Sequence, residues 1–247
     1  MFEPNVKRVL SLIQPGDVVL DLGGWAQPFR RANYVIDVAP YETRGFYGKI
    51  GMPPFQGEGP ERFSKQTWIQ RDICDHAPFP FADKSVDFVI CSHTLEDIRD
   101  PLWVCSEIIR IGKRGYIEVP SRLQESIVDF RTGLVGNEHH HWLVAIQGNR
   151  IEFERKGPDL ARSGLHLPAW HAFSLKKEER VQFLFWENQF EYTEISAAAG
   201  ERDRDDRQRR FVLSQPRPGA FRLPLAYLKY SILSLRHKLG DRGGRAA

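Results

Sequence analysis

The feature that most limits how this chain can fold is a series of five short apolar runs in its first half, separated by more polar segments. The runs are rich in Val and Ile and nearly continuous, which is typical of strands buried on both faces of a sheet. They lie at 17–22, 33–37, 67–72, 86–91 and 114–119. This alternation predicts βαβ units and an α/β fold, in which ligands bind at the carboxyl ends of parallel strands.

One connecting segment carries clear helix signals. Residues 100–111 begin with Asp100 as a candidate N-cap and Pro101 at the first helical position, followed by apolar residues at helical spacing. A second helix is expected over 121–131, capped by Ser121.

Further strands are expected after residue 121. Residues 142–155 predict a hairpin that turns at 148–149, where the sequence is Gly-Asn. Residues 181–187 and 189–195 predict two tightly joined strands, which would bring the main sheet to seven. Residues 40–66 are rich in Gly and Pro and show no period, so they predict a long loop, typical of a lid or of disorder.

The two ends of the chain differ in charge. Residues 200–247 hold 12 Lys and Arg against 5 Asp and Glu, a net +7, and residues 1–199 therefore carry −4 of the total of +3. A nucleic-acid enzyme more often carries basic surface around its site, so no nucleic-acid partner is expected. Residues 200–210 predict a solvated charged linker.

Residues 224–239 predict a basic amphipathic C-terminal helix, because large aliphatic residues recur there at alternating spacings of three and four. Three interpretations remain open: the helix packs on its own domain, pairs with a partner helix in a homo-oligomer, or lies on an anionic membrane surface.

Cysteine content and hydropathy narrow the class of protein further. The three cysteines are an odd number without CxxC spacing, which disfavours a disulfide framework and a structural zinc site. The first ten residues lack the apolar core of a signal peptide, and we find no apolar run of spanning length. We therefore expect a cytoplasmic protein, peripheral to a membrane if the C-terminal helix binds one.

Acidic and glycine residues follow three of the predicted strands. Asp21, Gly23 and Gly24 end the first strand, and glycines at such a turn let the backbone approach a ligand closely. Asp37 ends the second strand, where an acid can accept hydrogen bonds from both hydroxyls of a ribose. Asp72 and Ile73 follow the third strand and suit an exocyclic amine and an apolar base face. The turn is not GxGxxG, which disfavours a dinucleotide.

These residues occur in segments that resemble the class I S-adenosylmethionine-dependent methyltransferases. The matching segments are VVLDLGGW (18–25), YVID (34–37), RDICDHAPFPFADKSVDFVICSHTLEDIRDP (71–101) and RGYIEVPS (114–121). The resemblance implies a Rossmann-like, mainly parallel seven-stranded sheet with helices on both faces, to which the hairpin and the C-terminal helix are additions. It also implies S-adenosylmethionine as cofactor. This chain departs from the family at Trp25-Ala26-Gln27, where a third small residue is usual, and its first helix looks shortened, with Pro28 near its start.

The resemblance also implies a division of the chain and roles for its residues. Residues 1–199 would form the methyltransferase domain, with a cofactor-binding half (1–121) and a substrate side (122–199), followed by the linker and helix of 200–247. The proposed cofactor residues are Asp21, Gly23 and Gly24 at the methionine end, Asp37 at the ribose, Asp72 and Ile73 at the adenine, and Ser92 with His93 beside the sulfonium.

The function that we predict is methyl transfer to a small-molecule or glycan-like acceptor, with oxygen as the expected atom. Two alternatives remain open: a non-catalytic methyltransferase-like module that acts through a partner, and another α/β nucleotide-binding enzyme.

Histidines are the candidates for removing the acceptor's proton, because imidazole titrates near neutral pH. His93 follows the fourth strand, and His139, His140 and His141 follow the fifth. We assign no metal site, although His and carboxylate ligands suit several divalent ions. In an extended segment, neighbouring side chains point to opposite faces, so at most His139 and His141 could share an ion locally.

Overall fold

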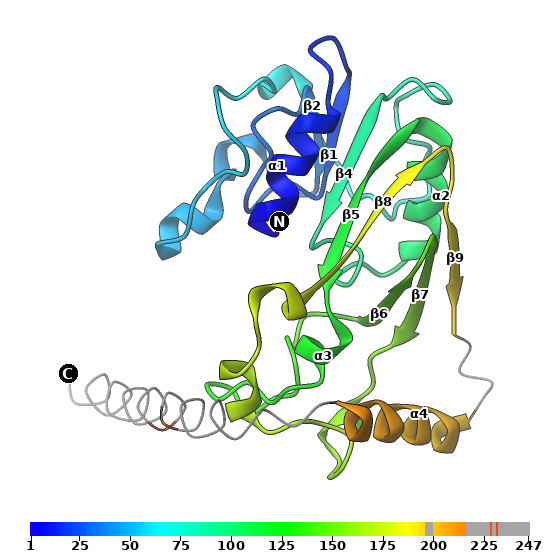
Figure 1. The fold of residues 1–247 in the computed structure, drawn as a ribbon. Helices are drawn as coiled ribbons and strands as arrows, with labels where there is room; N and C mark the ends of the chain where they lie inside the picture. The colour runs from blue at the N-terminus through cyan, green and yellow to red at the C-terminus, as the bar shows by residue number, and fades with distance from the viewer. Residues whose placement is uncertain (196–199, 216–227, 229–230, 232–247) are drawn as a thin grey trace.

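The computed structural model describes residues 1–195, 200–215, 228 and 231 (Figure 1). Its main sheet has six strands, and the five predicted in the first half of the chain form its parallel part. In spatial order the strands are β3 (Trp68–Gln70), β2 (Tyr34–Asp37), β1 (Val19–Leu22), β4 (Phe88–Ser92), β5 (Arg114–Pro120) and β8 (Val181–Glu187), the last antiparallel to β5. The predicted α/β class is confirmed, and the count of seven strands is wrong.

The strand expected as the seventh belongs to a second sheet. This sheet contains β6 (Trp142–Gln147), β7 (Arg150–Arg155) and β9 (Glu191–Glu194). The predicted hairpin is present as β6 and β7, and Gly148 at its turn has a φ of 59°. The chain bends at Asn188, and β9 then pairs in parallel with β7. Packing explains this choice, because Phe190 and Tyr192 join the apolar cluster beneath helix α2 rather than extending the edge of β8.

Helices cover both faces of the main sheet. Helix α1 (Glu3–Leu12) packs on one face and α2 (Pro101–Ile111) on the other. Strand β4 supplies both cores by alternation, because Phe88 and Ile90 join the α1 cluster while Val89 and Cys91 join the α2 cluster. The cap predicted for α2 is present, since the Asp100 side chain accepts a hydrogen bond from the Trp103 amide.

Residues 200–210, expected as a solvated linker, lie instead in helix α4 (Gly200–Ser214). The helix is held by polar contacts, because the buried Gln208 donates to Ser126 Oγ and to the Leu165 carbonyl, and Arg207 pairs with Glu154 at 3.1 Å. The segment is therefore a helix docked through Gln208 and Arg207, while Arg202, Asp203, Asp206, Arg209 and Arg210 remain exposed.

The remaining elements are short. Helix α3 (Arg122–Glu125) begins after Ser121 as expected but ends six residues before the predicted boundary at residue 131. Six 3₁₀ turns lie at Tyr41–Thr43, Phe46–Ile50, Lys65–Thr67, Pro158–Ala161, Ala169–Phe173 and Lys177–Arg180. The predicted helix over 224–239 falls outside the described residues except at 228 and 231. Within the described part of the chain, we find no helix with the length and apolarity to cross a membrane.

The helix expected after the glycine turn does not form: residues 23–33 connect β1 to β2 as a loop. Two amides of this loop are hydrogen-bonded by strand-end acids, Trp25 N by Asp37 Oδ2 at 3.0 Å and Phe29 N by Asp21 Oδ2 at 2.8 Å. Pro28 also lacks an amide for helical hydrogen bonding. No helix N-terminus therefore faces the glycine turn in this described loop.

Candidate active site

A cavity of about 400 Å³ lies at the carboxyl ends of β1 and β4. Its size is within the ~300–1,000 Å³ that is usual for small-molecule sites. It is lined by Met1, Asp21, Gly23, Gly24, Ala26, Gln27, Tyr47, Met52, Gln56, Ser92 and His93. Five of the predicted site residues thus share one cavity, and the long 40–66 loop contributes Tyr47, Met52 and Gln56 to its wall.

The glycine turn brings the backbone close to the strand-end acid. A Cβ atom added to Gly24 would lie 2.3 Å from Asp21 Oδ2, and one added to Gly23 would lie 2.2 Å from Thr94 Oγ1. Gly23 also has a φ of 76°, which side-chain-bearing residues rarely adopt. Both positions therefore require glycine, which leaves main-chain atoms exposed to the cavity.

Asp21 is buried, with 4% of its surface exposed. Burial raises its pKa to about 7, and the hydrogen bond from the Phe29 amide acts in the opposite direction without cancelling the shift. A cation in the cavity would favour the ionised carboxylate. Asp21 is therefore a suitable partner for an ammonium group.

Two polar atoms of the cavity wall, Ser92 Oγ and Gln56 Oε1, are buried and have no hydrogen-bond partner among the described residues. Buried polar atoms in folded proteins are usually paired. The Ser92 hydroxyl can donate or accept a hydrogen bond and Gln56 Oε1 can accept one, so the wall has unused hydrogen-bonding capacity toward a molecule in the cavity.

The other predicted cofactor residues do not line this cavity. Asp37 is buried and accepts hydrogen bonds from the Trp25 and Ala39 amides, and burial raises its pKa. Asp72 pairs with Arg99 at 2.7 Å, and Ile73 is 7% exposed within the apolar core. Their predicted contacts with ribose and adenine stay predictions.

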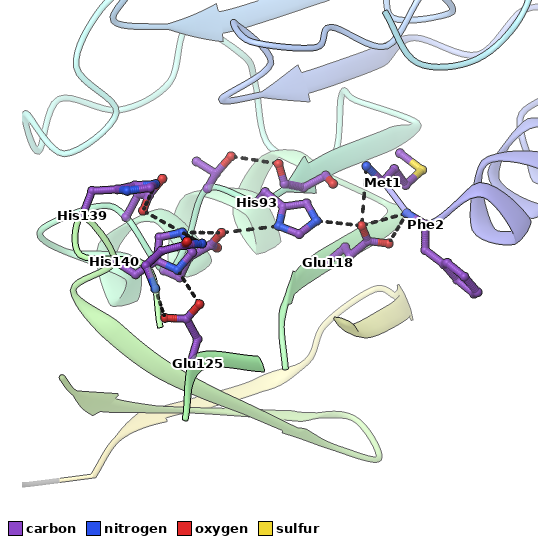
Figure 2. Close-up of polar contacts among 12 residues, drawn as sticks. Met1, Phe2, His93, Glu118, Glu125, His139 and His140 are labelled. Atoms are coloured by element: carbon purple, nitrogen blue, oxygen red, sulfur yellow. Dashed lines mark hydrogen bonds and ion pairs between the residues drawn. The ribbon is translucent and has the colours of Figure 1, made fainter. Parts of the chain in front are cut away.

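His93 lies between two buried carboxylates. Its Nε2 is 3.0 Å from Glu118 Oε1, and its Nδ1 is 3.6 Å from Glu96 Oε1 (Figure 2). Burial lowers the His93 pKa, but the contacts with Glu118 and Glu96 outweigh it and raise the pKa to about 9. A base must be neutral to take a proton, and this imidazole is protonated at neutral pH.

Glu118 connects the site to the start of the chain. Its side chain accepts hydrogen bonds at 2.9 Å from the Phe2 amide and a further bond from the Tyr116 hydroxyl (Figure 2). Burial opposes its ionisation, but the His93 contact and further positive charge lower the pKa of Glu118 to about 2. The Glu118 carboxylate therefore anchors both His93 and the segment that precedes α1.

A second group of acids and imidazoles follows β4 and precedes β6. His140 Nδ1 is 3.0 Å from Glu125 Oε1, and its Nε2 is 3.4 Å from Asp97 Oδ1 and 3.9 Å from Glu96 Oε1. Figure 2 shows His139 and His140 side by side above Glu125. The backbone makes this possible, because the Glu96 carbonyl accepts the His141 amide at 2.7 Å and fixes the start of β6 beside residues 96–97.

The expectation that at most His139 and His141 could share an ion locally assumed an extended segment, and this assumption is wrong. Residues 137–140 form a turn, with His140 N bonded to the Asn137 carbonyl at 3.3 Å, so the segment is not extended. His139 and His140 consequently meet edge to face, with ring centroids 4.6 Å apart. The side chain of His141 is exposed.

Sequence reasoning missed the carboxylates that organise the site, Glu96, Glu118 and Glu125. Glu118 carried a usable signal, because it is a charged residue within an otherwise apolar strand, RGYIEVP. Glu125 had no such signal, since its contacts with His140 and Lys156 join residues 15 and 31 positions apart.

Comparison with known proteins finds a family match in the first half of the chain. A family model described as a methyltransferase domain matches residues 55–117, from the loop before β3 to the middle of β5. No curated protein matches the chain.

Three solved structures illustrate the range of similar chains. A Haloferax volcanii putative methyltransferase, solved in complex with the Trm112 methyltransferase activator, is 23% identical over 46% of this chain and 50% of its own, with a TM-score of 0.31. An Aquifex aeolicus SAM-dependent methyltransferase is 18% identical over 48% of this chain and 65% of its own, with a TM-score of 0.28. A Mesorhizobium loti S-adenosylmethionine-dependent methyltransferase is 15% identical over 62% of this chain and 63% of its own, with a TM-score of 0.33. Each match spans less than two thirds of the solved chain, and these values are too low to transfer a substrate or a partner.

Proposed function

We propose that this chain, which carries an S-adenosylmethionine-dependent methyltransferase domain, transfers the cofactor's methyl group to an oxygen of a small-molecule or glycan-like acceptor. The cofactor supplies a sulfonium-bound methyl group that is already electrophilic. The protein's task is then to align the acceptor and to manage its proton.

The residues around the cavity fit the methionine end of the cofactor. The Gly23-Gly24 turn leaves room for close backbone approach, and Asp21 offers a carboxylate to the ammonium group. Ser92 Oγ and Gln56 Oε1 provide unused hydrogen-bonding atoms in the same wall. These unpartnered polar atoms around a cavity at two strand ends are the observation that carries the proposal.

The nucleoside end would lie toward β2 and β3. We propose that Asp37 accepts the ribose hydroxyls through lone pairs that its two amide bonds leave free. Asp72 and Ile73 would contact the adenine, with Asp72 turning from Arg99 toward the exocyclic amine.

The acceptor would enter on the side of Tyr47 and His93. In this proposal His93 orients the acceptor by donating a hydrogen bond, because the contacts with Glu118 and Glu96 hold its ring protonated. The acceptor's proton would leave on the side of the neighbouring group formed by Glu96, Asp97, His139 and His140, rather than pass to His93. The exposed His141 side chain would contact the acceptor from outside.

Turnover assays with methyl-labelled S-adenosylmethionine and a panel of phenols, sugars and amines test the proposal. We expect label in an O-methyl product together with stoichiometric S-adenosylhomocysteine. Label found in amine products alone would contradict the choice of oxygen. Tight cofactor binding without turnover on any acceptor would favour the non-catalytic alternative.

A further inference from the structure

Three side chains beside the cavity bring metal-ligating atoms together. One donor atom from each of Asp97, His139 and His140 lies within 4.8 Å of the others. Asp97 Oδ1 is 3.4 Å from His140 Nε2 and 3.9 Å from His139 Nε2. Two of these residues come from the turn before β6 and one from the turn after β4, so the fold and not the local sequence assembles them.

These separations suit a single ion. Donors at about 2.1 Å from one metal lie roughly 3.0–3.6 Å apart at angles of about 90–120°. The His140–Asp97 distance of 3.4 Å already falls in this range, and the His139–Asp97 distance of 3.9 Å needs only a small inward shift of exposed or half-exposed side chains. His139 and Asp97 can make that shift, since their side chains are 66% and 36% exposed.

The Glu96 carboxylate gives an independent indication of a ligand. Its side chain is 1% exposed, both of its oxygens lack a hydrogen-bond partner among the described residues, and its Oε1 points to within 3.9 Å of His140 Nε2. Asp97 Oδ1 is likewise buried without a hydrogen bond. Leaving such groups unpaired is costly, and coordination to a cation is one way in which proteins compensate buried carboxylates.

We propose that Asp97, His139 and His140, with Glu96 as a further oxygen ligand, bind one divalent transition-metal ion beside the cavity. This inference departs from the expectation of no metal site. It does not depend on methyl transfer, because metal binding by the protein alone tests it.

His140 is already oriented as a metal ligand. Its Nδ1 is 3.0 Å from Glu125 Oε1, and Lys156 Nζ holds the other oxygen of Glu125 at 2.9 Å. A carboxylate this close to Nδ1 favours the tautomer that carries its proton there and leaves Nε2 free to coordinate, and a carboxylate in this place is common around metal-bound histidines. Asn137 Nδ2 lies 3.3 Å from His140 Nε2, a long contact that the ion would displace.

The donor set selects the class of ion. Two imidazoles with one or two carboxylates favour Zn²⁺, Co²⁺, Mn²⁺ or Fe²⁺, whereas Mg²⁺ and Ca²⁺ prefer sites made of oxygen alone. The site borders the cavity, since Glu96 also contacts His93, which lines it. A role for the ion in binding the acceptor's oxygen and easing its deprotonation would rest on the proposed function.

Calorimetry with Zn²⁺, and absorption spectroscopy with Co²⁺, on the full chain freed of metal by chelation test the site. His139→Ala removes an exposed ligand, and Asp97→Asn provides a second variant. His141→Ala is the matched control, because it removes the neighbouring exposed imidazole outside the cluster. We expect one Zn²⁺ per wild-type chain, with affinity lowered at least ~10–100-fold in the two ligand variants, since loss of outer-shell partners alone costs that much.

The same experiment can overturn the proposal. Absence of stoichiometric Zn²⁺ binding to wild-type protein, or equal affinity in wild type, His139→Ala and Asp97→Asn, would contradict the site. So would a loss in His141→Ala as large as in His139→Ala. The Co²⁺ bands should be changed by His139→Ala and retained by His141→Ala, and Mg²⁺ should not compete with Zn²⁺.

Discussion

The carboxylates at the two halves of the sheet's carboxyl edge are satisfied in different ways. At the ends of β1 and β2, Asp21 and Asp37 accept hydrogen bonds from main-chain amides of the adjoining loops. Within β5 and in the turns that follow β4 and β5, Glu118, Glu96 and Glu125 face imidazole rings of His93 and His140. We call the part at β1 and β2 the backbone half, because main-chain amides hold its carboxylates. We call the part at β4 and β5 the side-chain half, because its carboxylates contact ionisable imidazoles.

In the proposed function, this difference separates binding of the cofactor from the chemistry on the acceptor. Amide contacts fix the path of a loop and create a cavity of defined shape, so they suit a constant ligand such as the cofactor. Contacts between carboxylates and imidazoles change with protonation and with bound cations, so they suit the half that handles the acceptor. The predictions below probe the two halves separately.

The largest effect is expected in the side-chain half, at Glu118. Its side chain is fully buried and binds the Phe2 amide, the Tyr116 hydroxyl and His93. Glu118→Ala should lower the free energy of unfolding by about 3–5 kcal/mol in denaturant titrations, because it leaves the buried partners uncompensated. Glu187→Ala, which removes an exposed glutamate from β8, serves as the control. A loss below about 1 kcal/mol would show that Glu118 is not an anchor.

In the backbone half, Gly24→Ala should disrupt the cavity. The new Cβ would lie 2.3 Å from Asp21 Oδ2, and overpacking of this kind costs about 1–3 kcal/mol. Thermal unfolding should detect this loss, together with weakened binding of S-adenosylhomocysteine. Gly16→Ala is the matched control, because its Cβ would meet no atom within 4 Å. Equal S-adenosylhomocysteine affinity in both variants would show that the glycine turn does not contact the cofactor.

Asp21 should make stability depend on pH. Its folded pKa of about 7 exceeds the usual aspartate pKa of 3.8, so the folded state binds more protons between these pH values and stability falls as pH rises from about 4 to 7. The contribution has a slope of up to about 1.4 kcal/mol per pH unit. Asp21→Asn should abolish it, as measured by unfolding at several pH values.

Cofactor binding sharpens this pH prediction. The ammonium group of S-adenosylmethionine should favour ionised Asp21, so wild-type affinity should rise with pH up to about 7 and then level off. An affinity that keeps the same pH dependence in Asp21→Asn would assign the titration to another group.

The smallest effect is expected at Arg99. It pairs with Asp72 at 2.7 Å, but the side chains are 62% and 43% exposed, and exposed pairs contribute about 0–1 kcal/mol. Arg99→Ala should therefore change stability by less than about 1 kcal/mol and leave S-adenosylhomocysteine affinity intact or improved. A loss of binding beyond about tenfold would instead make Arg99 part of the adenine site.

The sequence allowed the backbone half to be predicted better than the side-chain half. Buried parallel strands have a continuous apolar signature, and Asp21, Gly23 and Ser92 stand directly at strand ends, where topology alone places them together. The shortened helix expected near Pro28 does not form, because amides of the 23–33 loop instead donate to Asp21 and Asp37.

The side-chain half depends on contacts that periodicity does not encode. Glu118 meets Phe2 across 116 positions, and His140 reaches Glu96 through pairing that begins only at β6. Helix α4 shows the same limit, since its position depends on the burial of Gln208 and on ion pairs such as Arg207–Glu154, whose partners are distant in the sequence.

Binding of S-adenosylhomocysteine to a variant with a filled cavity tests the central claim most directly. Ser92→Phe places a ring where the unpartnered Ser92 Oγ faces the cavity, and Ser85→Phe adds the same ring at an exposed serine. Calorimetry should show binding to wild type and to Ser85→Phe, and none to Ser92→Phe. At a hundredfold excess over Kd, the ligand should stabilise the two binding proteins by ~2.7 kcal/mol. Undiminished affinity in a folded Ser92→Phe variant would contradict the claim that the cofactor occupies the cavity between β1 and β4.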